Sequence, residues 1–208
     1  MNMGDGKQVI SWAATLDERE ERVGHARGMI GLALAQVRYV NLDYRRFDLA
    51  APYDGPRHIV DANEWQQPTW SYPACDSVDH GVELTMTNDR RFTVTWDSPG
   101  WIEGIGLREQ PVFGFAVTET ADVAVWDVGE RSRWSSLIGA TVTDVELHYR
   151  PWDYPAGFWC SRISIDFGPT RVELLLGQGA ADGSITPSAD NVVVCFDADK
   201  LPTWELYE

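Results

Sequence analysis

The sequence repeats itself, and this limits the possible folds because both copies have to form the same structural unit. Residues 29–37 align with residues 137–145, and each segment holds an apolar pair, a glycine and further apolar positions in the same order. A second motif recurs later in both copies. Its aromatic and proline positions are Trp70, Tyr72 and Pro73 in the first copy and Trp152, Tyr154 and Pro155 in the second. We interpret these six residues as parts of the repeated scaffold.

The spacing of the two motifs predicts the boundaries of the units. The first motif recurs after 108 positions and the second after 82, so the first copy contains about 26 additional residues. We assign them to an insertion at about residues 41–67. The two units then cover residues 15–118 and 122–204, after an N-terminal tail at residues 1–14. The segment that joins the units is too short to let them move independently, so we expect one globular body.

Both units carry the period-two alternation of half-buried antiparallel strands. Residues 81–96 alternate around a turn at Asn88-Asp89, and residues 163–176 alternate around a turn at Gly168-Pro169. Both turns join strands that are predicted to form hairpins. The last strand of the first unit could be residues 104–107 or residues 112–115, and the alternation does not choose between them. Residues 177–190, rich in small and polar residues, are predicted to be a flexible surface loop.

Each unit begins with a helical signal. Thr15 and Glu18 have the spacing of a capping box, in which the threonine oxygen accepts from the Glu18 amide and the Glu18 carboxylate accepts from the Thr15 amide. Residues 127–137 give a weaker signal ahead of the second unit. We therefore predict a mainly β fold, an antiparallel β-sandwich or barrel-like body of two duplicated β-meander units, each preceded by a short helix.

Charge restricts the class of partner. The 208 residues include 32 Asp and Glu against 17 Lys and Arg, a net charge of −15. Such a charge repels nucleic acid phosphates and anionic lipid surfaces, so we expect neither as a partner. If the acidic surface has a binding role, a protein with a basic surface is the expected partner.

The cysteines and the apolar runs predict the compartment. Three cysteines without a Cys-x-x-Cys spacing argue against a disulfide framework and against a structural zinc site, so we expect three free thiols and a stability independent of reductant. The sequence has neither the pattern of a signal peptide nor an apolar run long enough to span a bilayer. These features together predict a cytoplasmic protein, which we take to be bacterial.

Linear catalytic motifs are absent. The chain contains no nucleophile elbow, zinc-protease helix, phosphate-binding loop or dinucleotide fingerprint, so the sequence favours a binding role over catalysis and predicts no cofactor. The segment from Cys75 to His80 gathers a thiol, two carboxylates and an imidazole. It lacks a second ligand pair at a recognised spacing, so we interpret it as a polar turn before a strand rather than as a metal site.

The candidate binding residues come from the part of the chain that breaks the repetition. An aromatic and arginine-bearing insertion in a duplicated scaffold is a suitable place for a specific function. We therefore select Tyr53, Arg57 and Trp65 from the insertion, together with Trp101, because tryptophan and arginine are enriched at binding hot spots and the chain has ten tryptophans. The sequence favours a non-catalytic binding protein, such as an acidic inhibitor or immunity-type partner of a basic protein. The alternative is a small-molecule-binding barrel or a motif-less enzyme, with a cleft between the repeats lined by Trp and Arg.

Overall fold

The computed structural model describes residues 10–44, 55–98, 103–153, 156–187, 190–197, 199 and 201 of the chain. These residues form a mainly β body in which two sheets, each six-stranded within the described part, pack around one large apolar core. The predicted fold class, a mainly antiparallel β-sandwich, is confirmed.

The first sheet is built mostly from the first half of the chain. Neighbouring strands in this sheet are antiparallel, except that the strands Arg57–His58 and Val123–Asp127 run parallel. The strand order is β3 (Arg57–His58), β8 (Val123–Asp127), β2 (Leu34–Leu42), β5 (Gly81–Met86), β6 (Arg91–Asp97) and β7 (Gly104–Arg108).

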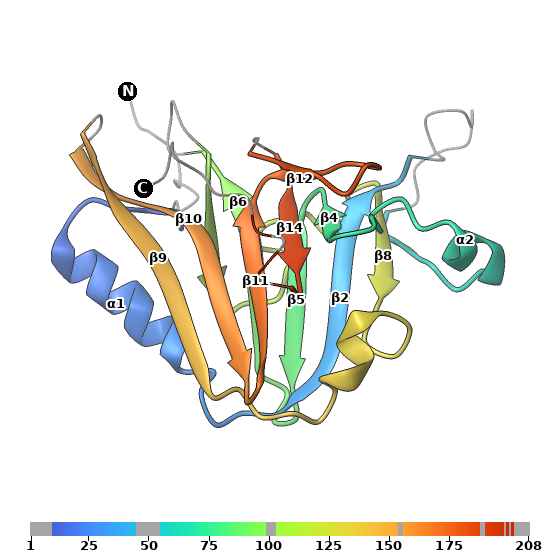
Figure 1. Ribbon diagram of the computed structural model, residues 1–208, viewed down its shortest axis with the longest axis horizontal. Helices are drawn as coiled ribbons and strands as arrows, with labels where there is room; N and C mark the ends of the chain where they lie inside the picture. Colours follow the sequence, from blue (N-terminus) through green and yellow to red (C-terminus); the bar gives the residue numbers. More distant parts are fainter. Residues whose placement is uncertain are drawn as a thin grey trace.

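The second sheet is built mostly from the second half, and all its pairs are antiparallel. Its order is β9 (Asp144–Asp153), β10 (Ala156–Phe167), β11 (Thr170–Leu176), β14 (Val192–Cys195) and β4 (Asp76–Val78), with β1 (Trp12–Ala13) also paired to β10. Figure 1 shows α1 (Leu16–Arg27) beside β9 at one side of the body and α2 (Ala62–Gln66) at the opposite side, beyond β8.

The two predicted hairpins form where the alternation meets a turn. The chain reverses between β5 and β6 at Asp89, which has a φ of 64°, and between β10 and β11 at Gly168, which has a φ of 65°. Aspartate and glycine both tolerate this left-handed backbone. The predicted flexible loop at residues 177–190 instead contains a small hairpin of β12 (Gln178–Gly179) and β13 (Ile185–Thr186). Its apolar residue Ile185 is buried, which a uniformly polar loop would not require.

The helical signals are confirmed with two changes. The Thr15 side chain accepts from the Glu18 amide at 3.2 Å, but the Glu18 carboxylate accepts from the amide of Ala14, at 2.8 Å, rather than from that of Thr15. The chain enters α1 extended, which brings the Ala14 amide within reach. The second helical signal is a single 3-10 turn, η2 (Arg133–Ser136).

A polar chain of three side chains crosses the core. The indole Nε1 of Trp134 donates to the Tyr39 hydroxyl at 2.7 Å, and this hydroxyl donates to the Asp76 carboxylate at 2.9 Å. All three residues are buried. Burial raises the pKa of Asp76 to about 6, although the bond from Tyr39 and the charge of Arg133 oppose the shift.

The two halves meet through reciprocal backbone contacts. Gly31 and Gly139 have φ angles of 85° and 84°. The Gly31 amide donates to the Val142 carbonyl at 2.9 Å, and the Gly139 amide donates to the Leu34 carbonyl at 2.7 Å. Gly139 follows Gly31 by 108 positions, and Val142 follows Leu34 by the same number, so exchanging the halves turns one contact into the other.

The two β-meanders, β2-β5-β6-β7 and β9-β10-β11-β14, also match strand for strand. Val37 faces Leu84 and Leu84 faces Phe92 in the first, as Val145 faces Ile165 and Ile165 faces Val172 in the second. In this comparison β7 takes the position of β14, which selects residues 104–107 over residues 112–115 as the last strand of the first unit. Duplication of the sequence stays a hypothesis, which this geometry favours.

The halves exchange strands as well. The first half contributes β1 and β4 to the second sheet, and β8 from the second half completes the first sheet. Of the predicted N-terminal tail at residues 1–14, residues 10–14 are described, and Trp12 and Ala13 pair with β10. Ile10 packs on β7 so closely that a Cβ on Gly106 would lie 2.5 Å from it, and Ser11 is buried.

Candidate binding site

The described part of the predicted insertion includes β3 and α2, and Arg57 of β3 links α2 to the sheet. Its Nε and Nη2 donate to both carboxylate oxygens of Asp43 at 2.7 and 2.8 Å, and its Nη1 donates to Glu64 at 3.0 Å. The Asp43 side chain is only 1% exposed, and these bonds raise the pKa of Arg57. All three guanidinium nitrogens are engaged inside the protein, so Arg57 holds α2 in place.

Trp65 projects from α2 into a cluster of aromatic rings. Its ring makes edge-to-face contacts with Trp70 and Trp126, with centroids 6.2 and 5.1 Å apart, and its indole N–H donates to the Ile59 carbonyl at 3.2 Å. The Arg131 guanidinium lies 5.1 Å from the Trp65 ring centroid. Edge-to-face pairs and cation–π contacts of this kind stabilise the position of a ring. Trp65 remains partly exposed on its outer side.

A hollow of about 480 Å³ opens beside Trp65. Its apolar lining includes Ile59, Val60 and Ile138, and Val60 is 80% exposed. Exposed Asp127 and Glu130 also line it, together with Arg131. The hollow thus combines an aromatic wall, an exposed aliphatic side chain and carboxylates.

The remaining sequence-selected residues have diverse positions. Tyr53, Trp101, Tyr154 and Pro155 lie outside the described residues. Trp70 is a core residue, 3% exposed, in edge-to-face contact with Tyr39 at 5.0 Å.

The other described members of the repeated motif lie near the surface. The carbonyls of Tyr72 and Pro73 both accept from Arg133 at 3.1 Å. Trp152 is partly exposed and packs on Trp159, with ring centroids 5.6 Å apart. Trp70 and Trp152 therefore occupy different environments, although both pack against other rings.

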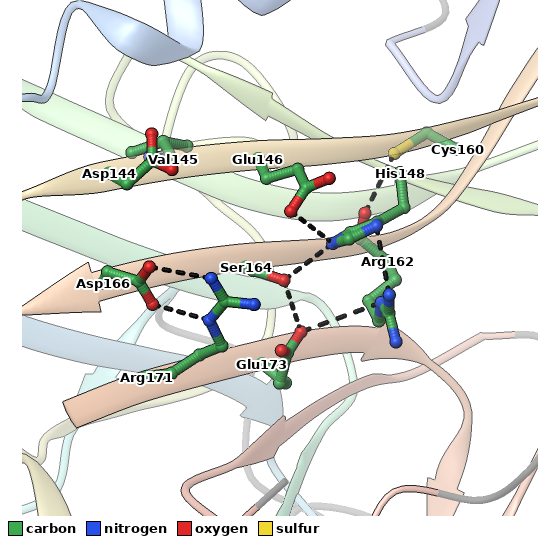
Figure 2. Close-up of polar contacts among 10 residues, drawn as sticks. All are labelled: Asp144, Val145, Glu146, His148, Cys160, Arg162, Ser164, Asp166, Arg171 and Glu173. Atoms are coloured by element: carbon green, nitrogen blue, oxygen red, sulfur yellow. Dashed lines mark hydrogen bonds and ion pairs between the residues drawn. The ribbon is translucent and has the colours of Figure 1, made fainter. Parts of the chain in front are cut away.

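A polar network lies on the outer face of the second sheet. In β9 and β10 odd-numbered residues such as Val145, Ile163 and Ile165 face the core, so their even-numbered neighbours face outward. In β11 the even-numbered residues Val172 and Leu174 face the core, so Arg171 and Glu173 face outward. Figure 2 shows this face, on which side chains of β9, β10 and β11 point toward one another. The central side chains are His148, Arg162, Ser164 and Glu173, and a bidentate pair between Arg171 and Asp166 lies beside them.

The hydrogen bonds of this network have a fixed direction. Arg162 Nη2 can only donate, so His148 Nδ1, 3.1 Å away, accepts and His148 Nε2 carries the proton. Nε2 then donates to the Ser164 hydroxyl at 2.7 Å, and this hydroxyl donates to Glu173 at 2.7 Å. Burial and the Arg162 charge lower the pKa of His148 to about 4, which favours the neutral ring. Burial raises the pKa of Glu173.

This arrangement does not activate Ser164 as a nucleophile. A histidine base would have to accept the serine proton, whereas His148 donates to the serine oxygen. Ser164 is also only 1% exposed, so a substrate cannot reach it. The network therefore links three strands and has no geometry for acyl transfer.

The segment from Cys75 to His80 also differs from its prediction as a polar turn. Asp76–Val78 form β4, and Cys75, Asp76 and Ser77 are all buried. Among the described residues, no group of three or more His, Cys, Asp or Glu side chains is arranged to hold a metal ion. Cys160 and Cys195 are both fully buried, Cys160 in the main core and Cys195 in a smaller apolar cluster.

Comparisons with protein-family models, curated proteins and solved structures find no match to this chain. None of the helices formed by the described residues is long and apolar enough to cross a membrane.

The sequence indicates Trp65 as a candidate, but it gives no signal for the other residues that complete the hollow. Val60 lies within the predicted insertion, yet a single valine in a polar segment gives no signal of its exposure. Asp127, Glu130 and Ile138 come from the second half, about 60 to 80 positions later. The polar network on the second sheet was detectable, because polar residues occupy alternate positions in three successive strands.

Proposed function

We propose that this protein is a non-catalytic binding protein that covers a basic surface of another protein, as an inhibitor or immunity-type partner does, in the bacterial cytoplasm. The observation that carries the proposal is the hollow beside α2, where Val60 is 80% exposed next to the ring of Trp65. Exposed aliphatic and aromatic side chains around a concave surface are typical of the centre of a protein interface.

The charge around the hollow supports a cationic partner. Asp127 and Glu130 line it and are exposed, and Asp61 lies exposed at the start of α2. Among the described residues that line it, Arg131 is the only cationic one, and its guanidinium lies over the Trp65 ring. The net charge of −15 makes the electrostatic potential of the whole molecule negative, which would accelerate its encounter with a basic protein. A lysine or arginine with a long apolar stem fits such a hollow, because its stem can contact Val60 and Trp65 while its charge meets the carboxylates.

The test uses a surface variant that leaves the fold intact. Tagged wild-type protein and Val60→Asp are used to capture partners from the source cell, and the affinity of any stoichiometric partner is then measured. Loss of an anchor of this kind costs about 2 kcal/mol or more, so we expect the affinity to fall at least about 30-fold. Rising ionic strength should weaken the wild-type complex.

Leu16→Asp is the matched control. Leu16 is 54% exposed and lies at the start of α1, where an acidic residue suits the helix N-terminus. The control should bind the partner like the wild type. A partner that binds Val60→Asp as tightly as it binds the wild type, or whose affinity is independent of salt, would contradict the proposal.

A second candidate function, binding of a small anionic molecule, is favoured by a larger hollow of about 620 Å³ between α1 and β7. Trp12, Arg22 and Arg108 line it, which gives it the tryptophan and arginine composition expected of a ligand cleft. Burial and the nearby Arg22 charge lower the pKa of Arg108, so an anion would relieve the repulsion between the two guanidinium groups.

Two of the three carboxylates that line this hollow have contacts within the protein, and the third, Glu21, is exposed. Glu109 pairs with Arg90 through two bonds of 2.7 Å, and Glu18 accepts from the Ala14 amide. Thermal melts with inorganic phosphate and with citrate test the candidate. Arg108→Gln should abolish any stabilisation, whereas Arg27→Gln, an exposed change in the last turn of α1, should preserve it. Equal stabilisation of both variants would exclude the site.

A further inference from the structure

Cys75 and Cys195 lie opposite each other on adjacent strands. In the ladder between β4 and β14, Val78 faces Val192, Ser77 faces Val193 and Asp76 faces Val194. One further step of the same register sets Cys75 opposite Cys195. The Sγ of Cys195 lies 3.9 Å from the carbonyl oxygen of Ala74, the residue before Cys75. The two thiols are separated by 120 positions in the sequence, so only the fold brings them together.

The backbone hydrogen bonds of β4 show whether Cys75 and Cys195 form a hydrogen-bonded or a non-hydrogen-bonded pair of the antiparallel ladder. The Cys75 carbonyl accepts from the Tyr72 amide at 2.9 Å, and the Ser77 amide donates to the Trp70 carbonyl at 2.8 Å. These odd-numbered residues therefore direct their backbone groups away from β14. Cys75 and Cys195 then form a non-hydrogen-bonded pair, in which Cα atoms are about 4.5 Å apart and side chains are closest. A disulfide requires Cα atoms about 4.4 to 6.8 Å apart.

The two side chains share one small apolar cluster with Leu175, Val193 and Ile185, on the outer face of the second sheet. The hairpin of β12 and β13 covers them, and a Cβ on Gly179 would lie 2.8 Å from Cys75 Sγ. Cys160 belongs instead to the main core between the sheets. The chain thus contains one facing pair and one separate cysteine.

We propose that Cys75 and Cys195 are a redox pair that forms a reversible disulfide across β4 and β14. A low-molecular-weight disulfide such as oxidised glutathione is the oxidant. One protein thiolate attacks it and forms a mixed disulfide with release of one glutathione thiolate, and the second protein thiolate then displaces the other. Two protein thiols become one disulfide, one glutathione disulfide becomes two thiols, and the protons pass to the released thiolates.

The cover of β12 and β13 controls the rate of this exchange. Both thiols are fully buried, and burial raises the pKa of Cys75 to about 11 and raises that of Cys195. Attack by a thiolate therefore requires the small hairpin to open. The pair is expected to stay reduced during brief exposure to oxidant and to close during prolonged exposure or mild destabilisation. This revises the expectation that stability is independent of reductant.

To test this proposal, the wild-type protein is incubated with oxidised glutathione, both in buffer and in urea below the unfolding midpoint. Free thiols are then alkylated, and the digested protein is analysed by mass spectrometry. We expect a peptide pair joined through Cys75 and Cys195, with a loss of two hydrogens, alkylated Cys160 and faster closure in urea. The disulfide should raise Tm by about 5 to 10 °C, because it cross-links distant parts of the unfolded chain, and dithiothreitol should reverse the shift.

Two variants give the control. Cys160→Ser should form the same disulfide, whereas Cys195→Ser should stop at a glutathione adduct on Cys75. Complete alkylation of all three cysteines after exposure in urea, a stable glutathione adduct on wild-type Cys75, or a disulfide that includes Cys160 would each overturn the proposal. The wild-type measurement alone decides the question if a variant fails to fold.

Discussion

Asp76 should make the stability of this protein fall as the pH rises through the weakly acidic range. Its side chain is buried, and its pKa is raised from 3.8 to about 6, mainly by burial. A carboxyl with a raised pKa binds its proton more tightly in the folded state. Its stabilising contribution is therefore complete below about pH 4 and is lost as the pH rises to about 6. A shift of about 2 units at 1.36 kcal/mol per unit corresponds to about 3 kcal/mol.

The change that tests this reasoning is Asp76→Asn. The amide oxygen can still accept from Tyr39, but the side chain no longer titrates. Urea unfolding of both proteins is measured at steps from about pH 4 to about pH 7, and the free energy of unfolding of the wild type is subtracted from that of the variant. This difference should increase by about 3 kcal/mol over the range, toward a relatively more stable variant. Any constant effect of the amide cancels. Parallel curves would show that Asp76 has an ordinary pKa, and the burial argument would be refuted.

Three further outcomes are expected. Gly139→Val should lower the free energy of unfolding, measured in urea, by about 1 to 2 kcal/mol or more, because the φ of 84° at Gly139 disfavours a side chain. Its control, Gly24→Ala in the interior of α1, should raise the free energy of unfolding by about 0.5 to 1 kcal/mol. Trp70→Ala should cost about 3 to 5 kcal/mol of stability, whereas partly exposed Trp65→Ala should cost less stability and reduce partner affinity more. Protein purified with reductant should return three free thiols on titration after denaturation; a lower number would contradict the reduced state.

The parts of the fold that the sequence predicted are those set by local pattern. Both hairpins depend on alternation and on a turn residue within a few positions, so residues 81–96 and 163–176 were recognised correctly. β4 was missed because it is short and polar, and because its partner β14 lies more than 100 positions away. No local pattern indicates such a pairing.

The candidate site shows the same contrast between features set by local pattern and features set by the fold. The insertion was predicted because it interrupts the apparent repeat, and Trp65 from this segment does line a hollow. Arg57 was selected as a contact for a partner, but its guanidinium is engaged by Asp43 and Glu64, 14 and 7 positions away. A sequence shows that an arginine is present, whereas only the fold shows which carboxylates surround it. The acidic residues of the hollow, Asp127 and Glu130, were missed for the same reason, because they come from the other half of the chain.

The exchange of strands between the halves has a consequence for synthesis on the ribosome. β4 emerges with the first half, but the Val194 and Val192 that face it emerge more than 100 residues later, and β2 also waits for β8. A nascent chain that ends near residue 118 therefore exposes unpaired strand edges, which favour aggregation. The two halves cannot mature one after the other. Completion of the native body depends on the emergence of β14, and a chain terminated before β14 is a substrate for chaperones and proteases rather than a smaller working protein.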